Sequence, residues 1–375
     1  MIMRRDLRIV FAGGGTGGHV FPAIYMAAFL SKHWGADCQF IGTKKGLENL
    51  KVSQAGFLVR HIWISGFKRG IYLSNLIFPF KLFISSMQSR TILKQIKPHL
   101  VIGTGGYVAG PVIRQAIKMN IPTAIQEQNS YPGVTTRLLA PKVDCVFLAY
   151  EEALNYLGNM KQYRIVGNPI KENLKVNNPK EALKYFGLQN GKITILVFGG
   201  SQGSRNINQA IDEILSSRIL NGVQIIWQTG QTDFDKYKEK YRNYTEFNVC
   251  ILPFIDRMDL AYAASNFAIT RAGAMTISEL IAVGLPAIFI PYPFAAGDHQ
   301  LKNARTIIKE GAAFLVEDNQ ELVKNLKEVL CAVLDSPDQI KGMAEKMHHL
   351  YHADTMRLIE EELLKLIGTD EQEKL

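Results

Sequence analysis

Short runs of apolar, largely β-branched residues recur along the chain, and each is followed by glycine and then by a longer stretch with helical spacing of its apolar positions. The clearest cases are "LRIVFAGGG", "LVIGTGG", "ITILVFGGS" and "FAITRAGAM". A buried strand followed by a helix is the repeating unit of a parallel sheet. The pattern therefore predicts an α/β protein.

The first of these segments has an echo in the second half of the chain. "RIVFAGGGTGGH" begins at Arg8, and the similar "TILVFGGSQGSRN" begins at Thr194. Two doubly wound, Rossmann-like domains explain the echo, and such domains bind ligands where loops leave the carboxyl ends of strands. The glycine- and proline-containing stretch "RIVGNPIKENLKVNNPKEAL" predicts a boundary. Residues 1–166 and 167–352 are the expected domains, and the amphipathic segment 353–375 either caps the second or packs back on the first.

Composition indicates the class of protein but does not identify its binding partner. The 375 residues are 47% hydrophobic, as in an ordinary globular protein, and the net charge of +9 favours phosphorylated metabolites, acidic lipid surfaces or nucleic acid. Four scattered cysteines without a CxxC pair predict neither a disulfide framework nor a zinc site. The apolar run at the N-terminus is too short for a signal peptide, and no run of about 18 apolar residues predicts a membrane span.

The loop after the first strand raises the first chemical question. Gly13, Gly15 and Gly18 satisfy GxGxxG, the dinucleotide pattern. That pattern also needs an acidic residue at the end of the second strand, where "DCQFIGTKKG" instead ends in Gly42 and Thr43. Bare amides at the start of a helix would still stabilise an oxyanion or a phosphate. The loop therefore predicts anion binding more strongly than dinucleotide binding.

A histidine and a polar cluster accompany this loop. His19 leads into the predicted helix, where its imidazole could take a proton from a hydroxyl near neutral pH or could merely cap the turn. In "IPTAIQEQNSYPG", Glu127, Gln128 and Asn129 follow a strand, where they suit sugar hydroxyls but would also suit a solvated loop. The glycines of "GTGGYVAGP" fit either a site or tight packing between helix and strand.

The second half offers a complementary set of groups. In "VFGGSQGSRNIN", Ser201 could donate to a phosphate beside a helix N-terminus. Thr276 and Glu279 are three apart on a predicted helix and share a face, where a carboxylate could hold two ribose hydroxyls. The "DFD" at 233–235 resembles a metal-binding DxD, but its lysine-rich surroundings favour a solvated face. No metal site is predicted.

Taken together, the motifs resemble those of the MurG family of N-acetylglucosaminyltransferases of bacterial peptidoglycan synthesis. From about Arg8 to Ala304, "GGGTGGHVFPA", "GTGGYVAGP", "QEQNSYPG", "VGNP", "GGSQGSRNIN", "RAGAMTISEL" and "PYPFAAGDHQLKNA" follow in the family's order. The resemblance implies a GT-B architecture, two Rossmann-like domains with a cleft between them. The first domain would face the acceptor and the membrane, and the second would bind the UDP-sugar.

The same resemblance implies an activity without a cofactor. N-acetylglucosamine would pass, with inversion, from UDP-N-acetylglucosamine to the 4-hydroxyl of an undecaprenyl-pyrophosphoryl-muramyl pentapeptide at the cytoplasmic face of the plasma membrane. A peripheral contact with an anionic membrane surface is expected, and nucleic acid is not an expected partner. A UDP-N-acetylglucosamine epimerase of similar fold and a non-catalytic nucleotide-sugar scaffold are the alternatives.

The resemblance also assigns roles to residues. His19 would be the catalytic base, with Glu127 as the second choice. The residues implied to bind substrate are Ile255 near the uracil, Ala274, Met275 and Thr276 along the diphosphate, Glu279 on the ribose, and Ser201 and Gln300 beside them. Thr16, Gly17, Gly18 and Asn129 would face the donor from the opposite side of the cleft. This chain departs from some members at Gln126, Lys171 and His299. Lys171 stands where arginine is common, so the charge is kept and the bidentate fork is lost.

A segment of the first half predicts the membrane contact. In "GFKRGIYLSNLIFPFKLFISSMQSR", helical spacing places Leu73, Ile77, Phe80, Ile84 and Met87 on one side and Ile71, Phe78 and Leu82 on the other. Lys68, Arg69, Lys81 and Arg90 surround these apolar positions, as expected for docking on anionic headgroups. Packing against another helix, or a kink at Pro79, would explain the same pattern.

Overall fold

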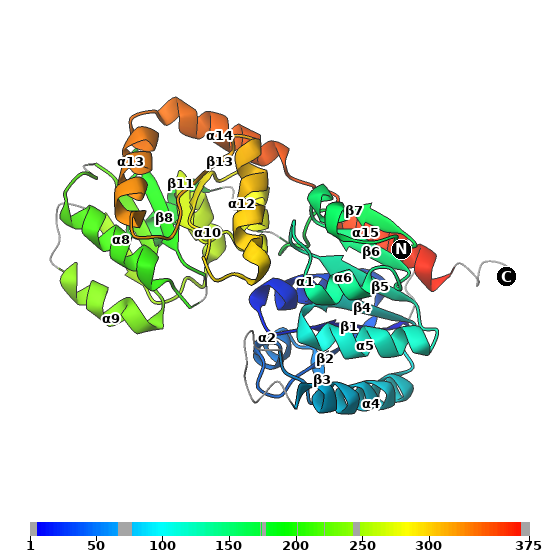
Figure 1. The fold of residues 1–375 in the computed structure, drawn as a ribbon. Coiled ribbons are helices and arrows are strands. Elements are labelled where there is room, and N and C mark those ends of the chain that lie inside the picture. Colours follow the sequence, from blue (N-terminus) through cyan, green and yellow to red (C-terminus); the bar gives the residue numbers. More distant parts are fainter. Residues whose placement is uncertain are drawn as a thin grey trace. The chain divides into compact units, whose positions relative to one another are not determined.

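The computed structural model describes residues 6–66, 77–172, 174, 178–200, 202–220, 222–242 and 248–368, which form two compact units. The first unit comprises Met1–Ile170 with Asp354–Leu375, and the second comprises Lys171–Ala353 (Figure 1). Each unit contains one parallel β-sheet covered by helices, so the predicted α/β class and doubly wound fold are confirmed.

The first unit contains a seven-stranded sheet in the order β3-β2-β1-β4-β5-β6-β7. Its strands are β1 Arg8–Gly13, β2 Asp37–Gly42, β3 Leu58–His61, β4 Leu100–Gly105, β5 Thr123–Glu127, β6 Cys145–Leu148 and β7 Tyr163–Ile165. Its helices are α1 Gly17–Trp34, α2 Leu47–Gln54, α4 Phe78–Ile96, α5 Gly106–Lys118, α6 Val134–Leu139, the 3₁₀ helix η1 Glu151–Tyr156 and α15 Thr355–Ile367.

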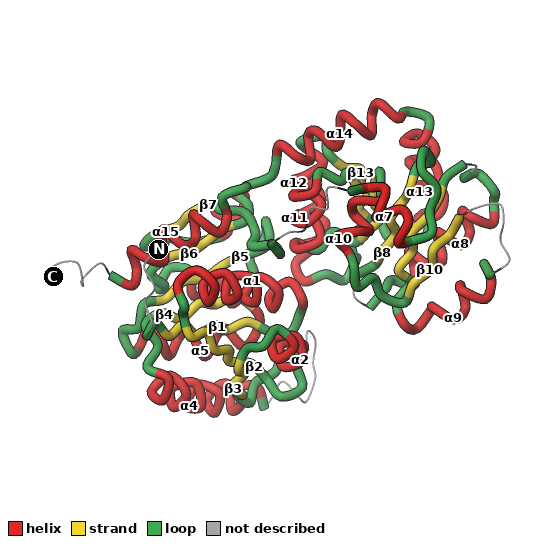
Figure 2. Tube along the Cα trace, turned by 180° about the vertical axis from the view of Figure 1, so that it is seen from behind, coloured by secondary structure: helices red, strands yellow, loops and turns green. Residues whose placement is uncertain are grey.

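Alternation along the strands explains how this sheet is covered on both faces. Ile9 and Phe11 pack in the core under α1 and α15, whereas Val10 and Ala12 pack in the core under α4 and α5. Successive strand residues point to opposite faces, so a run of apolar residues marks a strand buried on both sides. Figure 2 shows the two helix layers on either side of the sheet.

The C-terminal helix α15 packs back on the first unit. Ile359 and Leu363 are fully buried in the core beside α1, and Glu362 forms an ion pair with Arg164 of β7 at 2.8 Å. Of the two placements that the sequence leaves open, the structure shows the second.

The first unit extends to residue 170 rather than to the expected 166. The amide of Val166 donates to the Leu148 carbonyl at 2.9 Å, and the Asn168 side chain accepts from Gln126 at 2.8 Å. The "VGNP" stretch therefore continues the hydrogen bonding of the first sheet before the chain crosses over.

The second unit repeats the same winding with a six-stranded sheet in the order β10-β9-β8-β11-β12-β13. Its strands are β8 Thr194–Phe198, β9 Gln224–Gln228, β10 Asn248–Leu252, β11 Phe267–Thr270, β12 Ala287–Phe289 and β13 Ala313–Leu315. Its helices are α7 Pro179–Tyr185, α8 Arg205–Ser216, α9 Gln231–Lys240, α10 Met258–Ala264, α11 Ala274–Val283, η2 Ala296–Asp298, α12 His299–Lys309, α13 Leu322–Leu334 and α14 Pro337–His349.

The echoed sequences form corresponding strands. β1 and β8 each lie third in their sheet, next to β4 and β11 respectively, where the winding reverses. This reversal is the topological switch point at which doubly wound sheets bind ligands. A ligand site is therefore expected at the loops that follow these four strands.

Part of the segment expected to touch a membrane forms helix α4. α4 starts at Phe78, with Pro79 in its first turn, where a missing N–H costs nothing, so Pro79 does not kink it. Phe78 and Leu82 pack against the core, whereas Phe80 and Met87 are 58% and 56% exposed. Four residues of the expected pattern lie outside the described residues: Lys68, Arg69, Ile71 and Leu73. In the described parts of the chain, no helix has both the length and the apolar content to cross a membrane.

Candidate functional site

The β1–α1 loop places His19 beside a helix N-terminus. Thr16 is the N-cap of α1 with an extended backbone, so the amides of Gly17 and Gly18 belong to the first turn, which has no preceding intrahelical carbonyl. His19 Nδ1 lies 3.1 Å from Thr16 Oγ1 and 3.3 Å from the carbonyl oxygen of Gly14. The predicted anion-binding loop and the predicted base are thus adjacent.

The second glycine loop packs directly on His19. Gly105 and Gly106 have φ values of +100° and +75°, which other residues rarely adopt. A Cβ on Gly105 would lie 2.7 Å from His19 Cδ2, and one on Gly106 would lie 2.1 Å from the Gly14 carbonyl oxygen. This loop is therefore packed tightly against the β1–α1 loop, and its effect is to fix the imidazole at the switch point between β1 and β4.

Glu48 is a functional candidate that the sequence pattern did not reveal. It is 1% exposed on α2, and its carboxylate accepts from the Gly15 amide at 3.2 Å and from the Thr43 amide and hydroxyl at 3.0 and 2.7 Å. Glu48 is thus an acidic residue that follows the second strand, five residues beyond Thr43. It binds the backbone of the glycine loop, whereas the dinucleotide pattern expects an acidic residue that binds a ribose at the strand end.

Glu127 is buried at the end of β5 and is engaged on both oxygens. Oε1 accepts from the Asn129 amide and side-chain nitrogen at 3.1 and 3.0 Å, and Oε2 accepts from the Gly133 amide at 3.1 Å. These bonds fold the loop that carries Asn129, which is partly exposed. The carboxylate therefore holds the loop in shape.

Buried amide side chains tie three of the recognised motifs together. Gln126 donates to Asn168, Asn168 donates to the Gln128 carbonyl at 3.1 Å, and Gln128 donates to the Thr104 carbonyl at 2.9 Å. Buried polar groups need such partners. Gln126, one of the departures from the family pattern, is thus part of the scaffold behind the loops.

In the second unit, Gln228 joins two loops of the expected donor site. Its side chain donates to the Gly200 carbonyl at 2.9 Å and accepts from the amide of the buried Ile255 at 2.8 Å. Gln228 is the last residue of β9 and is 1% exposed. It was not singled out from the sequence, although a polar side chain at the carboxyl end of an apolar strand was the signal that could have identified it. Ser201 lies outside the described residues.

Helix α11 carries the residues that are expected to bind the diphosphate and the ribose of the donor. Ala274, Met275 and Thr276 form its first turn, after the N-cap Gly273. Glu279 lies one turn further on, and its Oε2 accepts from the Tyr262 hydroxyl at 2.7 Å. Burial raises the pKa of the Glu279 carboxyl above its usual value, and the Tyr262 hydrogen bond and the positive charge of Lys171 oppose that rise.

Arg271 and the start of α12 hold the loops around α11. Arg271 pairs with the buried Asp318 at 2.7 Å and donates to Ser204 at 2.7 Å, which links the β8 and β11 loops. Gln300 accepts from the Tyr292 amide at 2.9 Å, and His299 Nδ1 lies 2.9 Å from the Ala296 carbonyl oxygen. His299 therefore contacts the turn that precedes its own helix.

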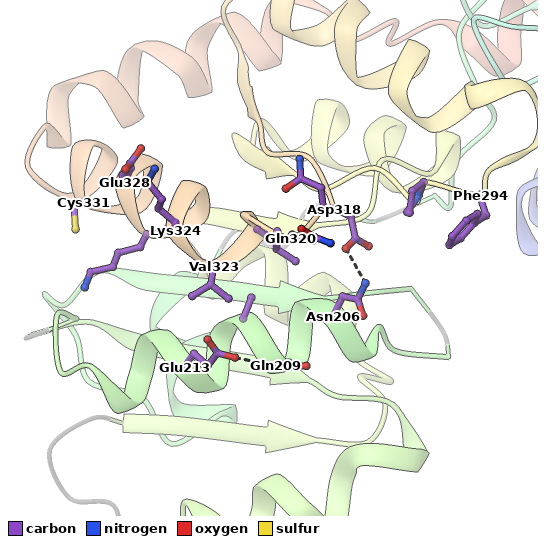
Figure 3. Close-up of a pocket in the computed structure, with 15 residues that line it drawn as sticks. Asn206, Gln209, Glu213, Phe294, Asp318, Gln320, Val323, Lys324, Glu328 and Cys331 are labelled. Atoms are coloured by element: carbon purple, nitrogen blue, oxygen red, sulfur yellow. Dashed lines mark hydrogen bonds between the residues drawn. The ribbon is translucent and has the colours of Figure 1, made fainter.

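A separate cavity of about 1090 Å³ lies between α8 and α13 (Figure 3). Asn206, which donates to Asp318 at 2.7 Å, and the exposed Phe294 line one end of it, but no residue of the expected site does. The "DFD" stretch lies on α9, where Asp233 accepts from Asn208 at 2.8 Å. Among the described residues, no group of three or more His, Cys, Asp or Glu side chains could hold a metal ion.

Comparison with known proteins places these loops in a family context. Residues 9–148 match the glycosyltransferase family 28 N-terminal domain, and residues 194–361 match its C-terminal domain. The UDP-N-acetylglucosamine--N-acetylmuramyl-(pentapeptide) pyrophosphoryl-undecaprenol N-acetylglucosamine transferase of Christiangramia forsetii is 42% identical over 98% of this chain and 99% of its own. The transferase of the same name from Flavobacterium psychrophilum is 41% identical over 96% and 98%.

A solved structure has a similar fold. The crystal structure of Acinetobacter baumannii MurG superposes with a TM-score of 0.76 at 27% identity, covering 94% of this chain and 98% of that one.

Proposed function

This chain belongs to glycosyltransferase family 28 and, within it, to the MurG family, and we infer that it transfers N-acetylglucosamine from UDP-N-acetylglucosamine to a muramyl-pentapeptide acceptor on pyrophosphoryl-undecaprenol. The two parallel α/β units have the GT-B architecture. The observation that carries the function is the 42% identity with such a transferase over 98% of the chain.

We propose that the second unit binds the donor. The first turn of α11 offers amides to the diphosphate, and Glu279 accepts the ribose hydroxyls, with Tyr262 fixing its orientation. Ile255 lies beside the uracil on a loop held by Gln228. Ser201, Gln300 and Lys171 complete this set, Lys171 as a point charge near Glu279. The amides stabilise the charge that grows on the departing UDP.

We propose His19 as the base for the acceptor hydroxyl. The Gly14 carbonyl can only accept, so Nδ1 carries the hydrogen when it donates to that oxygen, and the lone pair then resides on Nε2. Nε2 takes the proton of the 4-hydroxyl as its oxygen bonds to the anomeric carbon and the bond to UDP breaks. Thr16, Gly17 and Gly18 lie next to His19 at the start of α1, and with Asn129 they are proposed to face the donor. Glu127 is the weaker choice because the bonds to Asn129 and Gly133 engage both of its oxygens.

We propose that α4 and α5 dock the first unit on an anionic membrane surface. A cavity of about 680 Å³ between them is lined by the exposed Phe83 and Met87 and by the cationic Arg90, Arg114 and Lys118. Exposed apolar side chains with a basic rim suit the headgroup boundary. Phe83→Ser should reduce co-sedimentation with phosphatidylglycerol vesicles, and equal binding to neutral vesicles would contradict this surface.

The function is tested with purified protein, labelled UDP-N-acetylglucosamine and the lipid-linked muramyl pentapeptide. UDP and a disaccharide product should appear together, and only with the acceptor present. Consumption of donor without acceptor would favour an epimerase, and donor binding without turnover would favour a scaffold.

A further inference from the structure

A second cavity of the first unit opens beside the glycine loop. It has a volume of about 610 Å³ and lies at the carboxyl ends of β2 and β3. The lining residues that matter here are Lys44, Lys45, His61, Trp63, Ile64 and Tyr107. This volume is within the range of small-ligand sites.

Tyr107 connects this cavity to the proposed reaction centre. Its ring lines the cavity, and a Cβ on Gly15 would lie 2.9 Å from its Cε1. Gly15 is next to Thr16, which contacts His19. Tyr107 therefore lies between the cavity and the loop that leads to His19, so a ligand in the cavity is next to that loop.

The lining is cationic at one end and apolar along the wall. Lys44 and Lys45 are exposed, and the neighbouring carboxylate of Glu48 is already bound to Thr43 and Gly15. Trp63 forms the wall with 47% of its surface exposed, held by a hydrogen bond from its amide to Gln88 at 2.7 Å. Apolar walls are of no use to a diphosphate, but they suit the aliphatic side chains of a peptide, whose carboxylates the lysines can pair.

We propose that this cavity is the acceptor subsite for the peptide arm, with Lys44 and Lys45 pairing its carboxylates and Trp63 packing on its side chains. The proposal rests on the proposed function, because a muramyl-pentapeptide acceptor is what supplies such an arm.

Fluorescence tests binding without turnover. Trp34 and Trp227 are buried, so the exposed Trp63 is the tryptophan that a ligand in this cavity reaches. Soluble N-acetylmuramyl pentapeptide, without lipid or pyrophosphate, should shift the emission saturably, and Trp63→Phe should abolish the shift. Inorganic pyrophosphate should neither cause the shift nor compete with it. A shift with pyrophosphate alone, or none with the peptide, would overturn the proposal whether or not the protein transfers sugar.

Kinetics test the lysines. In the Lys44→Gln/Lys45→Gln variant, the KM for the pentapeptide acceptor should rise about fivefold or more. The KM for a matched lipid acceptor that lacks the peptide, and the donor KM, should stay unchanged. Lys51→Gln/Lys142→Gln removes two charges from the same unit outside the cavity and serves as control. Equal increases for both acceptors would mean that the lysines bind the pyrophosphate, and no increase would mean that they bind neither. An absence of transfer by the wild type would instead refute the proposed function.

Discussion

Glu48 Oε2 accepts a hydrogen bond from the Gly15 amide at 3.2 Å, so a buried carboxylate of α2 fixes the glycine loop that leads to His19. Its other oxygen accepts from the amide and hydroxyl of Thr43. Both oxygens therefore face donors. The loop geometry depends on an acceptor-only side chain at this position.

Glu48→Gln should lower kcat about tenfold, because its NH₂ group must face the N–H of either Gly15 or Thr43 and a hydrogen bond to a charged group is lost. The donor KM should change little, since the residues proposed to bind the donor lie in the second unit. Steady-state kinetics measure both values. Glu345→Gln, at an exposed position, is the control. Unchanged kcat in a normally folded Glu48→Gln protein would refute the positioning role.

His19→Ala should reduce kcat by roughly 10²-fold or more, the usual contribution of a general base, with only a modest loss of donor affinity. The limb of the pH–rate profile that reports deprotonation of the base should disappear. Rapid-quench kinetics and donor titration separate the two effects. Loss of that limb in Glu127→Gln, with the limb kept in His19→Ala, would move the role to Glu127.

Glu279→Gln should weaken donor binding about tenfold, because the variant loses the charged group that we propose as acceptor for the ribose hydroxyls. Calorimetric titration with UDP measures this change. An unchanged affinity would remove Glu279 from the donor site.

The same variant should have a pH-dependent effect on stability. The Glu279 pKa is raised in the folded protein, so the contribution of this group is fully present below the unfolded pKa and is lost as the pH rises through the folded value. Glu279→Gln should therefore raise Tm relative to the wild type at about pH 8 and lose that advantage below about pH 4, near the ordinary Glu pKa. The opposite pH trend would contradict the raised pKa.

Leu363→Ala should destabilise the first unit by about 2–5 kcal/mol, because Leu363 is fully buried and truncation leaves a cavity. Hydrogen exchange should show faster exchange in β1 and α1, with the second unit unaffected. Glu361→Ala, on the exposed side of α15, should change stability by less than about 0.5 kcal/mol. Loss of protection confined to the second unit would contradict the packing of α15 seen here.

Local patterns carried most of the fold prediction. The apolar runs around Ile9 and Ile195 are buried on both faces of their sheets, and that burial produced the repeated signal in the sequence. The glycines at 105 and 106 were visible as a motif, and their positive φ values explain why glycine stands there. The residue roles assigned by resemblance remain predictions to be tested by the variants above.

Contacts between distant segments could not be read in this way. Glu48 meets Gly15 across 33 positions, and Gln228 meets Ile255 across 27. Neither contact has a periodic signal, because a single buried hydrogen bond constrains one residue rather than a pattern.

By itself, the sequence determined the parallel α/β class, the duplicated winding and the family. The class and the winding follow from local strand and helix periodicities, and the family follows from motifs in a fixed order. Tertiary structure alone decided that α15 returns to the first unit, that "VGNP" stays with the first sheet, and that Glu48 holds the loop before His19. Those outcomes depend on which buried surfaces and polar groups satisfy one another after the chain has closed its long loops, and the free energy of that choice is not encoded in any one segment.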